Sequence, residues 1–218
     1  GSDLEGIHYL RTMGDVDGIR ESMGSASRIC IVGGGYIGLE VAAVARTSGL
    51  DVTVLEMEDR ILQRVTTPEM SAYYHQLHAG RGVNIMTNTT VSGFQGNGSV
   101  SAVLCGDEII EADLVIVGIG IIPNVELAET AGLKCENGIV VDDHCRSSDP
   151  DIYAAGDCTN HPNPLLNRRL RLESVPNAME QARVASANML GGDRVYAAIP
   201  WFWSDQYELK LQMVGFST

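Results

Sequence analysis

The 218-residue sequence contains no long hydrophobic run, and no segment approaches the roughly 18 apolar residues that a membrane-spanning helix needs. Its amino end also lacks the basic stretch and apolar segment of a secretory signal peptide. Basic residues are few, because 15 Lys and Arg stand against 28 Asp and Glu, and the formal net charge is −13. Nucleic acid and anionic membranes repel such a chain, so we expect neither as the main partner. Because the sequence shows neither a membrane-spanning run nor a signal peptide, the expected compartment is the cytoplasm.

Cysteine is sparse and irregularly placed. The five cysteines are odd in number and far apart, and they form neither a C-x-x-C pair nor a zinc-ligand spacing with histidine. We therefore expect reduced, mostly structural thiols and no metal site. They are Cys30, Cys105, Cys135, Cys145 and Cys158.

The composition, with 44% hydrophobic residues and 24 glycines, is typical of a globular α/β protein. Residues Leu10–Met23 are expected to start extended and turn helical, with Asp15 as the N-cap. A buried strand at Ile29–Val32, a helix at Tyr36–Ser48 and a second strand at Val52–Leu55 then form a βαβ unit.

The following segments continue an α/β pattern. A capping threonine and a proline predict a helix that ends near Gly80, and Val83–Met86 returns to the sheet. From Thr90 to Glu111, short runs separated by turns predict an antiparallel meander. Three further strands and one long helix are expected at Leu114–Val117, Ile139–Val141, Ile152–Ala154 and Val175–Leu190.

A glycine-rich turn joins the first strand of the βαβ unit to its helix, in the sequence GGGYIG. Gly33 allows the tight turn, Gly35 allows close approach to a pyrophosphate, and Gly38 allows the helix to pack on the strand. Glu56 follows 18 residues after Gly38, where a carboxylate accepts from ribose hydroxyls and repels a 2′-phosphate, so NAD is favoured over NADP, although Arg60 is close. The alternative is a flexible loop followed by a solvated acid, which the strand, the helix and the distal acid together disfavour.

Six segments in order resemble one family. They are LRT (10–12), VGGGYIGLE (32–40), VGIGIIPN (117–124), SSDPDIYAAGDC (147–158), ESVPNAMEQAR (173–183) and PWFWSDQY (200–207). The family is that of the FAD- and NADH-dependent ferredoxin and rubredoxin reductases that supply electrons to bacterial oxygenases. The last two segments are more specific than the glycine turn, which many oxidoreductases share.

The resemblance implies site residues for both cofactors. For NAD it implies Gly33, Gly35, Tyr36 and Ile37 in the pyrophosphate turn, Glu40 near the nicotinamide carboxamide, Glu56 at the adenosine ribose, and Gly120 in the loop along the cofactor. For FAD it implies Gly156 and Asp157 at the ribityl and phosphate groups, Ser174 and Val175 at the pyrimidine edge, and Trp203 against the isoalloxazine ring. On pattern alone, Asp157 could equally be a turn acid, and Trp203 a core or edge-strand residue.

The resemblance also implies a fold and its division. The fold is a three-layer FAD/NAD(P)-binding, Rossmann-like α/β fold, in which a central parallel sheet has helices on one face and an antiparallel meander on the other. Residues 1–24 correspond to a FAD-domain remnant and linker, 25–125 to the NAD-binding domain, 126–195 to the rest of the FAD-binding domain, and 196–218 to the start of a C-terminal sheet domain. Since the family's own FAD-binding glycine turn would precede Leu10, we expect an internal portion of a reductase, with on the order of 100 residues missing at the front.

The implied activity transfers a hydride from NADH to FAD and then single electrons to an iron-sulfur ferredoxin or rubredoxin. Because the cofactors do this chemistry, no catalytic side chain is expected, and no triad is recognisable. Arg168, Arg169 and Arg171 could dock the partner or simply form a solvated loop. Two alternatives remain: a pyridine nucleotide-disulfide reductase, and an NADH-sensing module similar to apoptosis-inducing factor. For the chain by itself we expect NADH binding without turnover.

Overall fold

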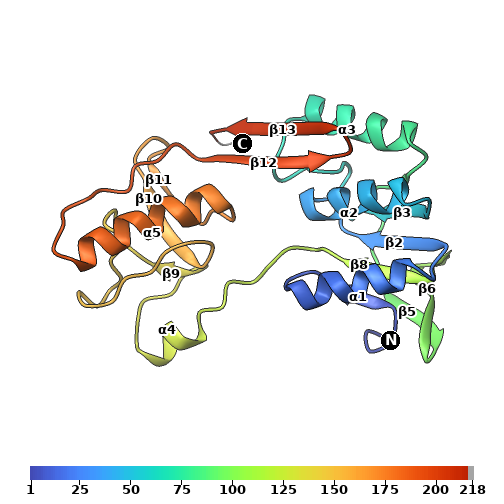
Figure 1. The fold of residues 1–218 in the computed structure, drawn as a ribbon, viewed down its shortest axis with the longest axis horizontal. Coiled ribbons are helices and arrows are strands. Elements are labelled where there is room, and N and C mark those ends of the chain that lie inside the picture. The colour runs from blue at the N-terminus through green and yellow to red at the C-terminus, as the bar shows by residue number, and fades with distance from the viewer. Residues whose placement is uncertain (216–218) are drawn as a thin grey trace. The chain divides into compact units, whose positions relative to one another are not determined.

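The computed structural model describes residues 1–215 (Figure 1). Within them the chain forms two compact units. The first comprises Gly1–Gly120 with Ser204–Leu211, and the second comprises Ile121–Trp203 with the segment that starts at Gln212. Each unit has its own buried apolar cluster. The division into four parts that the sequence suggests stays a prediction.

A five-stranded parallel sheet forms the centre of the first unit. Its strand order is β1-β8-β2-β3-β4, and all neighbouring pairs are parallel. The central strand β2 is short, apolar and buried on both sides, as strands with both faces covered usually are. The strands are β1 (Ile7–Tyr9), β2 (Arg28–Val32), β3 (Asp51–Leu55), β4 (Asn84–Met86) and β8 (Leu114–Val117).

One face of this sheet packs on an antiparallel meander. Alternate side chains of β2, Cys30 and Val32, share a buried cluster with Val103 and Cys105 of the meander. The meander pairs in the order β5-β6-β7, with antiparallel neighbours. The predicted meander is therefore confirmed, with strands at β5 (Gly93–Asn97), β6 (Ser99–Cys105) and β7 (Glu108–Glu111).

Helices cover the opposite face of the sheet. Ile31, which alternates with Cys30, points at helix α2, because its Cγ2 lies 3.3 Å from the Cβ position that a side chain at Gly38 would have. The crossovers β1-α1-β2, β2-α2-β3 and β3-α3-β4 all advance in the same direction along the sheet, and right-handed crossovers then place their helices on one face. The predicted three-layer arrangement is confirmed. The helices are α1 (Met13–Met23), α2 (Tyr36–Thr47) and α3 (Pro68–Gly80).

Helix α1 begins earlier than its predicted N-cap. Its N-cap is Thr12, and Asp15 is the third helical residue, where its carboxylate accepts from the Thr12 backbone N–H at 2.6 Å. The Thr12 hydroxyl accepts in turn from the Asp15 N–H at 3.3 Å. The prediction of Asp15 as the N-cap was wrong because Asp15 completes a capping box with a threonine three residues earlier.

The second unit contains a three-stranded sheet of order β11-β10-β9 and two helices. The predicted strand Ile152–Ala154 does not form. Only Tyr153 makes a β-bridge, with Arg146, because the Ile152 N–H bonds back to Asp149 O in a local turn. Elements α4, β10 and β11 were not predicted from the sequence. The elements are α4 (Glu126–Thr130), α5 (Val175–Met189), β9 (Ile139–Val140), β10 (Thr159–Asn163) and β11 (Arg168–Leu170).

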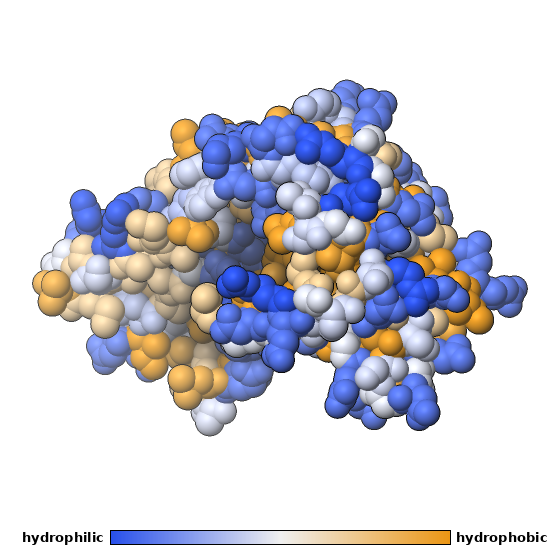
Figure 2. All heavy atoms as spheres, turned by 45° about the vertical axis from the view of Figure 1, so that its right-hand side comes forward, coloured by the Kyte–Doolittle hydropathy of each residue, from blue (hydrophilic) through white to orange (hydrophobic). Residues whose placement is uncertain are grey.

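The chain then enters a two-stranded sheet, β12 (Trp201–Gln206) with β13 (Leu209–Val214), whose strands run side by side in opposite directions (Figure 1). Figure 2 shows hydrophilic and hydrophobic residues interspersed over the face that it draws. Within residues 1–215, no helix combines the length and apolarity needed to cross a bilayer.

Candidate functional site

The glycine turn lies between β2 and α2, and two of its glycines are required by packing. Gly33 has φ +110, and a Cβ there would come within 2.4 Å of the Gly118 carbonyl oxygen. A Cβ on Gly38 would lie only 2.0 Å from the Gly33 oxygen. The strand, the helix and the loop after β8 therefore meet too closely at this point for any side chain.

Gly35 differs from its neighbours because the space beside it is open. No atom lies within 4 Å of the Cβ position at Gly35. The residue is also the N-cap of α2, and no side chain caps this end of the helix. The positive end of the helix dipole therefore faces open space, which is the arrangement that binds a phosphate group.

Tyr36 and Ile37 open helix α2 directly after this space. The Tyr36 hydroxyl donates to the Val65 carbonyl oxygen at 3.4 Å, and burial raises the pKa of the phenol. Ile37 is half exposed, so an apolar surface flanks the turn on the solvent side. Both predicted residues thus border the open space at Gly35.

Glu56 lies at the end of β3, and two backbone donors fix its carboxylate. Oε2 accepts from the Gly34 N–H at 2.8 Å, and Oε1 accepts from the Glu58 N–H at 3.0 Å. Arg60, the nearby cation that could favour a 2′-phosphate, donates instead to the carbonyl oxygens of Gln63 and Thr66. The edge of the glycine turn at Glu56 is therefore acidic, and Arg60 is engaged elsewhere.

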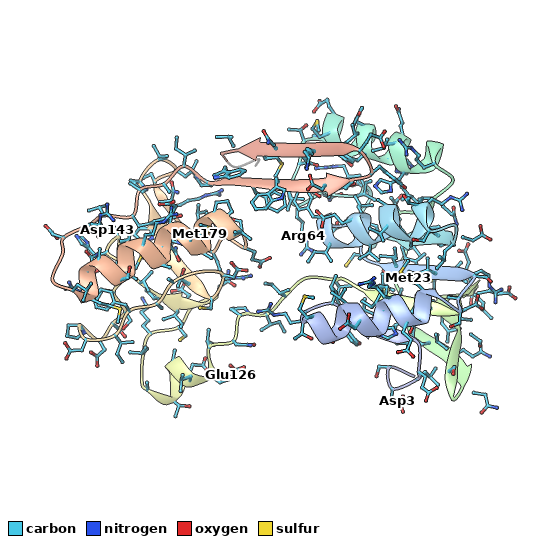
Figure 3. The ribbon with its side chains drawn as sticks, in the orientation of Figure 1. Asp3, Met23, Arg64, Glu126, Asp143 and Met179 are labelled. Carbon is cyan, nitrogen blue, oxygen red and sulfur yellow. The ribbon has the colours of Figure 1, made fainter. Side chains whose placement is uncertain are left out.

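The loop after β8 closes the other side of the turn. The Gly118 N–H donates to Val32 O, and Gly120 has φ +116. Arg64, labelled in Figure 3, has Nη2 4.0 Å from the Cβ position at Gly120, and its side chain is exposed. Sequence reasoning did not identify Arg64, since a lone arginine in a loop carries no signal of its own.

Glu40 lies one turn into α2, and its partner comes from far along the chain. Oε1 of Glu40 accepts from the Ser204 hydroxyl at 2.6 Å, across 164 sequence positions. Glu40 also borders a cavity of about 680 Å³, lined mainly by apolar side chains of α1 and α2. Met23, which Figure 3 labels at the end of α1, contributes to that lining.

The predicted FAD residues all lie in the second unit. Gly156 has φ +91, and its N–H donates to the buried Gln181 side chain at 2.7 Å, which ties the AAGD segment to α5. Asp157 is exposed, while its carbonyl oxygen accepts from Arg171 at 3.3 Å. The segment is held rigidly through its backbone, and the carboxylate of Asp157 faces solvent.

The remaining FAD residues lie on α5 and β12. Ser174 is the N-cap of α5 and its hydroxyl accepts from the Asn177 N–H at 3.3 Å, while Val175 is exposed. The ring centroids of Trp201 and Trp203 are 5.4 Å apart, and both rings are partly exposed. Aromatic side chains that stay partly exposed beside each other offer a flat apolar surface to a ring system.

The five cysteines are free thiols. Burial raises the pKa of Cys30 to about 12 and that of Cys145 to about 11. A buried thiol with a raised pKa is a poor nucleophile. The expectation of structural rather than reactive cysteines agrees with these positions.

One acidic cluster surrounds a histidine in the second unit, at Asp142, Asp143 and His144 (Figure 3 labels Asp143). The Nδ1 of His144 lies 2.7 Å from Asp143, and its Nε2 lies 3.0 Å from Asp193. Both ring nitrogens are thus engaged by carboxylates, and the Asp143 hydrogen bond raises the pKa of His144. The cluster has the geometry of an ion pair with two acids.

Comparison with known proteins gives a consistent result. The family profile described as "Pyridine nucleotide-disulphide oxidoreductase" matches residues 1–182, and the profile "Reductase C-terminal" matches residues 201–218. Putidaredoxin reductase of Pseudomonas putida is 51% identical over 215 residues, covering 97% of this chain and 51% of the relative. Rhodocoxin reductase of Rhodococcus erythropolis is 46% identical, covering 99% of this chain and 51% of the relative.

Solved structures agree with the sequence relatives. The putidaredoxin reductase of a covalent complex with putidaredoxin superposes with a TM-score of 0.95 at 49% identity, covering 99% of this chain and 53% of that one. A ferredoxin reductase from Rhodopseudomonas palustris gives a TM-score of 0.95 at 41% identity, with 99% and 54% covered. The chain spans about half the length of the curated relatives it matches. The resemblance drawn from the sequence motifs is confirmed, and the chain belongs to the pyridine nucleotide-disulphide oxidoreductase family.

Proposed function

We propose that this chain is the NADH-binding portion of a FAD-dependent reductase that passes electrons to a ferredoxin or rubredoxin, in a system that serves an oxygenase. The observation that carries the proposal is the open space beside Gly35 at an uncapped helix end. The fixed carboxylate of Glu56 borders the same turn. Together they fit the pyrophosphate and the adenosine ribose of NADH.

Each residue of the turn has a separate part in this proposal. Gly35, Tyr36 and Ile37 would hold the pyrophosphate, Glu56 would accept from ribose hydroxyls, and Gly120 would line the cofactor. Glu40 would accept from the nicotinamide carboxamide. Arg64 adds an exposed cation near Gly120 that would favour the anionic ligand. When bound, the two cofactors would supply the redox chemistry, which is hydride transfer from NADH to FAD.

The second unit would contribute part of a flavin site. Gly156 and Asp157 would contact the ribityl and phosphate groups, and Ser174 and Val175 the pyrimidine edge. Trp203 would pack against the ring system. Support comes from the exposed carboxylate of Asp157 and from a backbone that Gln181 holds in place.

The positions and pKa values of the cysteines favour a ferredoxin or rubredoxin reductase over a disulfide reductase. Their wide separation and the raised pKa values of Cys30 and Cys145 leave this chain without a redox pair of its own. Five reduced thiols also support the proposal of a cytoplasmic location. An NADH-sensing module would differ in the rate of flavin reoxidation, because protein acceptors would reoxidise its reduced flavin slowly.

A nucleotide titration tests the proposed NADH site. We expect the chain to bind NADH at least about tenfold more tightly than NADPH, because Glu56 repels a 2′-phosphate. Glu56→Gln should lose most of that preference. Glu58→Gln is the matched control, since it removes the same charge two residues away, and it should keep the preference. Equal affinity of the unaltered chain for NADH and NADPH would contradict the assignment of Glu56.

An absorption spectrum tests the flavin part of the proposal. The purified chain is expected to be colourless and to bind NADH. A yellow protein that NADH bleaches would show that this chain keeps FAD and turns over without further residues. That result would contradict the expectation of NADH binding without turnover.

We propose an acidic iron-sulfur protein as the electron acceptor, docked near Arg168, Arg169 and Arg171. Arg169 also donates to Val141 O at 2.6 Å, and Arg171 pairs with Glu173 at 2.7 Å. The charge reversal is made at Arg168, whose side chain is exposed, and thermal melting checks that the variant is folded.

Arg168→Glu should weaken binding of a purified acidic [2Fe–2S] ferredoxin about tenfold at low salt, with the difference shrinking at high salt. Arg183→Glu, an exposed charge reversal on α5, is the control. Equal losses in the two variants would speak against docking at the arginine cluster.

A further inference from the structure

A continuous row of hydrogen-bonded side chains ends at Glu40. It starts at Tyr207, whose hydroxyl lies 3.3 Å from Nδ1 of His78 on α3. Nε2 of His78 lies 2.8 Å from Oε1 of Gln206, and Nε2 of Gln206 lies 3.1 Å from the Ser204 hydroxyl. That hydroxyl is 2.6 Å from Oε1 of Glu40. All of these residues belong to the first unit.

The middle of the row is completely buried. His78, Ser204 and Gln206 each have 0% of their surface exposed. A buried polar group that loses its partner is destabilising, so each of these groups is held to the contact it makes. Glu40, by contrast, is only half-buried and remains accessible to a ligand.

Only one arrangement of protons satisfies all four contacts. A carboxylate only accepts, so the Ser204 hydroxyl must donate to Glu40 and must itself accept from the Gln206 amide nitrogen. The Gln206 oxygen then accepts from Nε2–H of His78, which leaves Nδ1 to accept from Tyr207. Reversal of the Gln206 amide would take the Ser204 proton away from Glu40.

His78 stays neutral in this row. Burial lowers its pKa, and the nearby Arg81 and His75 lower it further, although the Gln206 hydrogen bond acts in the opposite direction. A neutral imidazole offers one donor and one acceptor, which is what its two contacts require. Since every donor points the same way, each bond polarises the next and strengthens the last one, at Glu40.

We propose that Ser204, Gln206 and His78 are positioning residues that hold the Glu40 carboxylate for the nicotinamide carboxamide of NADH. Within residues 1–215, Ser204 is the residue whose side chain donates to Glu40, through Oε1. Oε2 is left to accept the carboxamide N–H. This inference rests on the proposed function, which places the nicotinamide beside Glu40. On this proposal, Ser204 and Gln206 of β12 take part in cofactor recognition, although they lie far from Glu40 along the chain.

Calorimetric titration with NADH and with ADP-ribose, which lacks the nicotinamide, isolates this contact. We expect Ser204→Ala to bind NADH about tenfold more weakly and to bind ADP-ribose as the unaltered chain does. Ser204→Thr keeps the hydroxyl and should restore the affinity for NADH. Gln206→Leu should weaken NADH binding about threefold, because Ser204 loses its donor.

Two controls complete the design. Ser99→Ala removes another serine that donates to a glutamate, the exposed contact to Glu5 at 3.4 Å, and should leave both affinities unchanged. An acetylpyridine analogue of NADH, which lacks the carboxamide N–H, should bind Ser204→Ala and the unaltered chain equally well. Thermal melting checks that each variant is folded, and Glu40→Gln provides a second variant with the same expected selective loss.

The outcomes separate the two proposals. Equal weakening of NADH and ADP-ribose by Ser204→Ala, or no weakening, would overturn the positioning role and leave the NADH site intact. Equal affinity of the unaltered chain for the two ligands would also overturn it, because the nicotinamide would then not be held. Failure of the unaltered chain to bind either ligand would refute the proposed function itself.

Discussion

Replacing Gly35 by alanine should abolish most NADH binding without unfolding the chain. No atom lies within 4 Å of the added methyl group, and the residue has φ −78, which alanine adopts easily. Alanine is a weaker N-cap than glycine, so we expect a loss of at most about 1 kcal/mol in the free energy of unfolding. The methyl group would occupy the space that the proposed site gives to the pyrophosphate. NADH affinity should therefore fall at least about tenfold, which corresponds to about 1.4 kcal/mol.

Gly38→Ala should mainly lower the stability of the chain. Its methyl carbon would lie 2.0 Å from the Gly33 oxygen, about 1 Å short of the 3.0 Å that real contacts keep. Because the atom in the way is backbone, strand β2 or helix α2 must shift. Overpacking of this kind costs about 3 kcal/mol in the free energy of unfolding. Gly80→Ala, at the end of α3, also meets no atom within 4 Å and should change stability by less than about 1 kcal/mol.

Urea unfolding followed by circular dichroism, together with fluorescence titration of NADH, measures both quantities in the three variants. We expect Gly35→Ala to lose NADH affinity at near-normal stability, Gly38→Ala to lose stability, and Gly80→Ala to lose neither. Normal NADH binding by Gly35→Ala would refute the idea that the cofactor approaches the backbone there. A Gly38→Ala variant as stable as Gly80→Ala would refute the packing argument.

Two histidines of the second unit should give opposite pH dependences of stability. Burial lowers the pKa of His161 to about 4, so the unfolded chain takes up a proton before the folded one does. Stability should therefore fall from about pH 6.5 to about pH 4 by about 3 kcal/mol, and His161→Asn should flatten that part of the urea-unfolding profile. At His144, the Asp143 hydrogen bond raises the pKa, so its contribution is complete below about pH 6.5 and disappears as the pH rises through the folded-state pKa. His144→Gln should accordingly destabilise the chain at pH 5.5 and have less effect at pH 8.5; an equal effect at both would exclude this ion pair as the cause.

Much of the first unit could be predicted from local sequence. The run ICIV forms the buried strand β2, and the following helix and strand form as expected, because apolar β-branched runs and amphipathic helices are determined by neighbouring residues. The meander was predicted from its turns. Errors came where the competing signals were also local: Thr12 and Asp15 form a capping box in which Thr12 is the N-cap, and a turn at Asp149 prevents the strand at Ile152–Ala154.

The candidate site likewise contains residues that the sequence predicted and residues that it did not. The glycines of the turn and Glu56 were identified because their spacing reflects a single βαβ unit, in which the chain returns to the same edge of the sheet. Arg64 and Ser204 were missed as site residues. They lie beside Gly120 and Glu40 only after the chain has folded, and neither has a spacing that marks it.

The sequence by itself determined the glycine turn, the order of the strands and helices around it, and the family, since each depends on residues close together in the chain. The tertiary structure alone decided which side of the turn is open, at Gly35, and which glycines are closed by packing. It also decided the partner of Glu40. His78 and Gln206 are 128 positions apart, and Glu40 and Ser204 are 164 apart, so only the packing inside the first unit, to which all four residues belong, brings their hydrogen-bonding groups together.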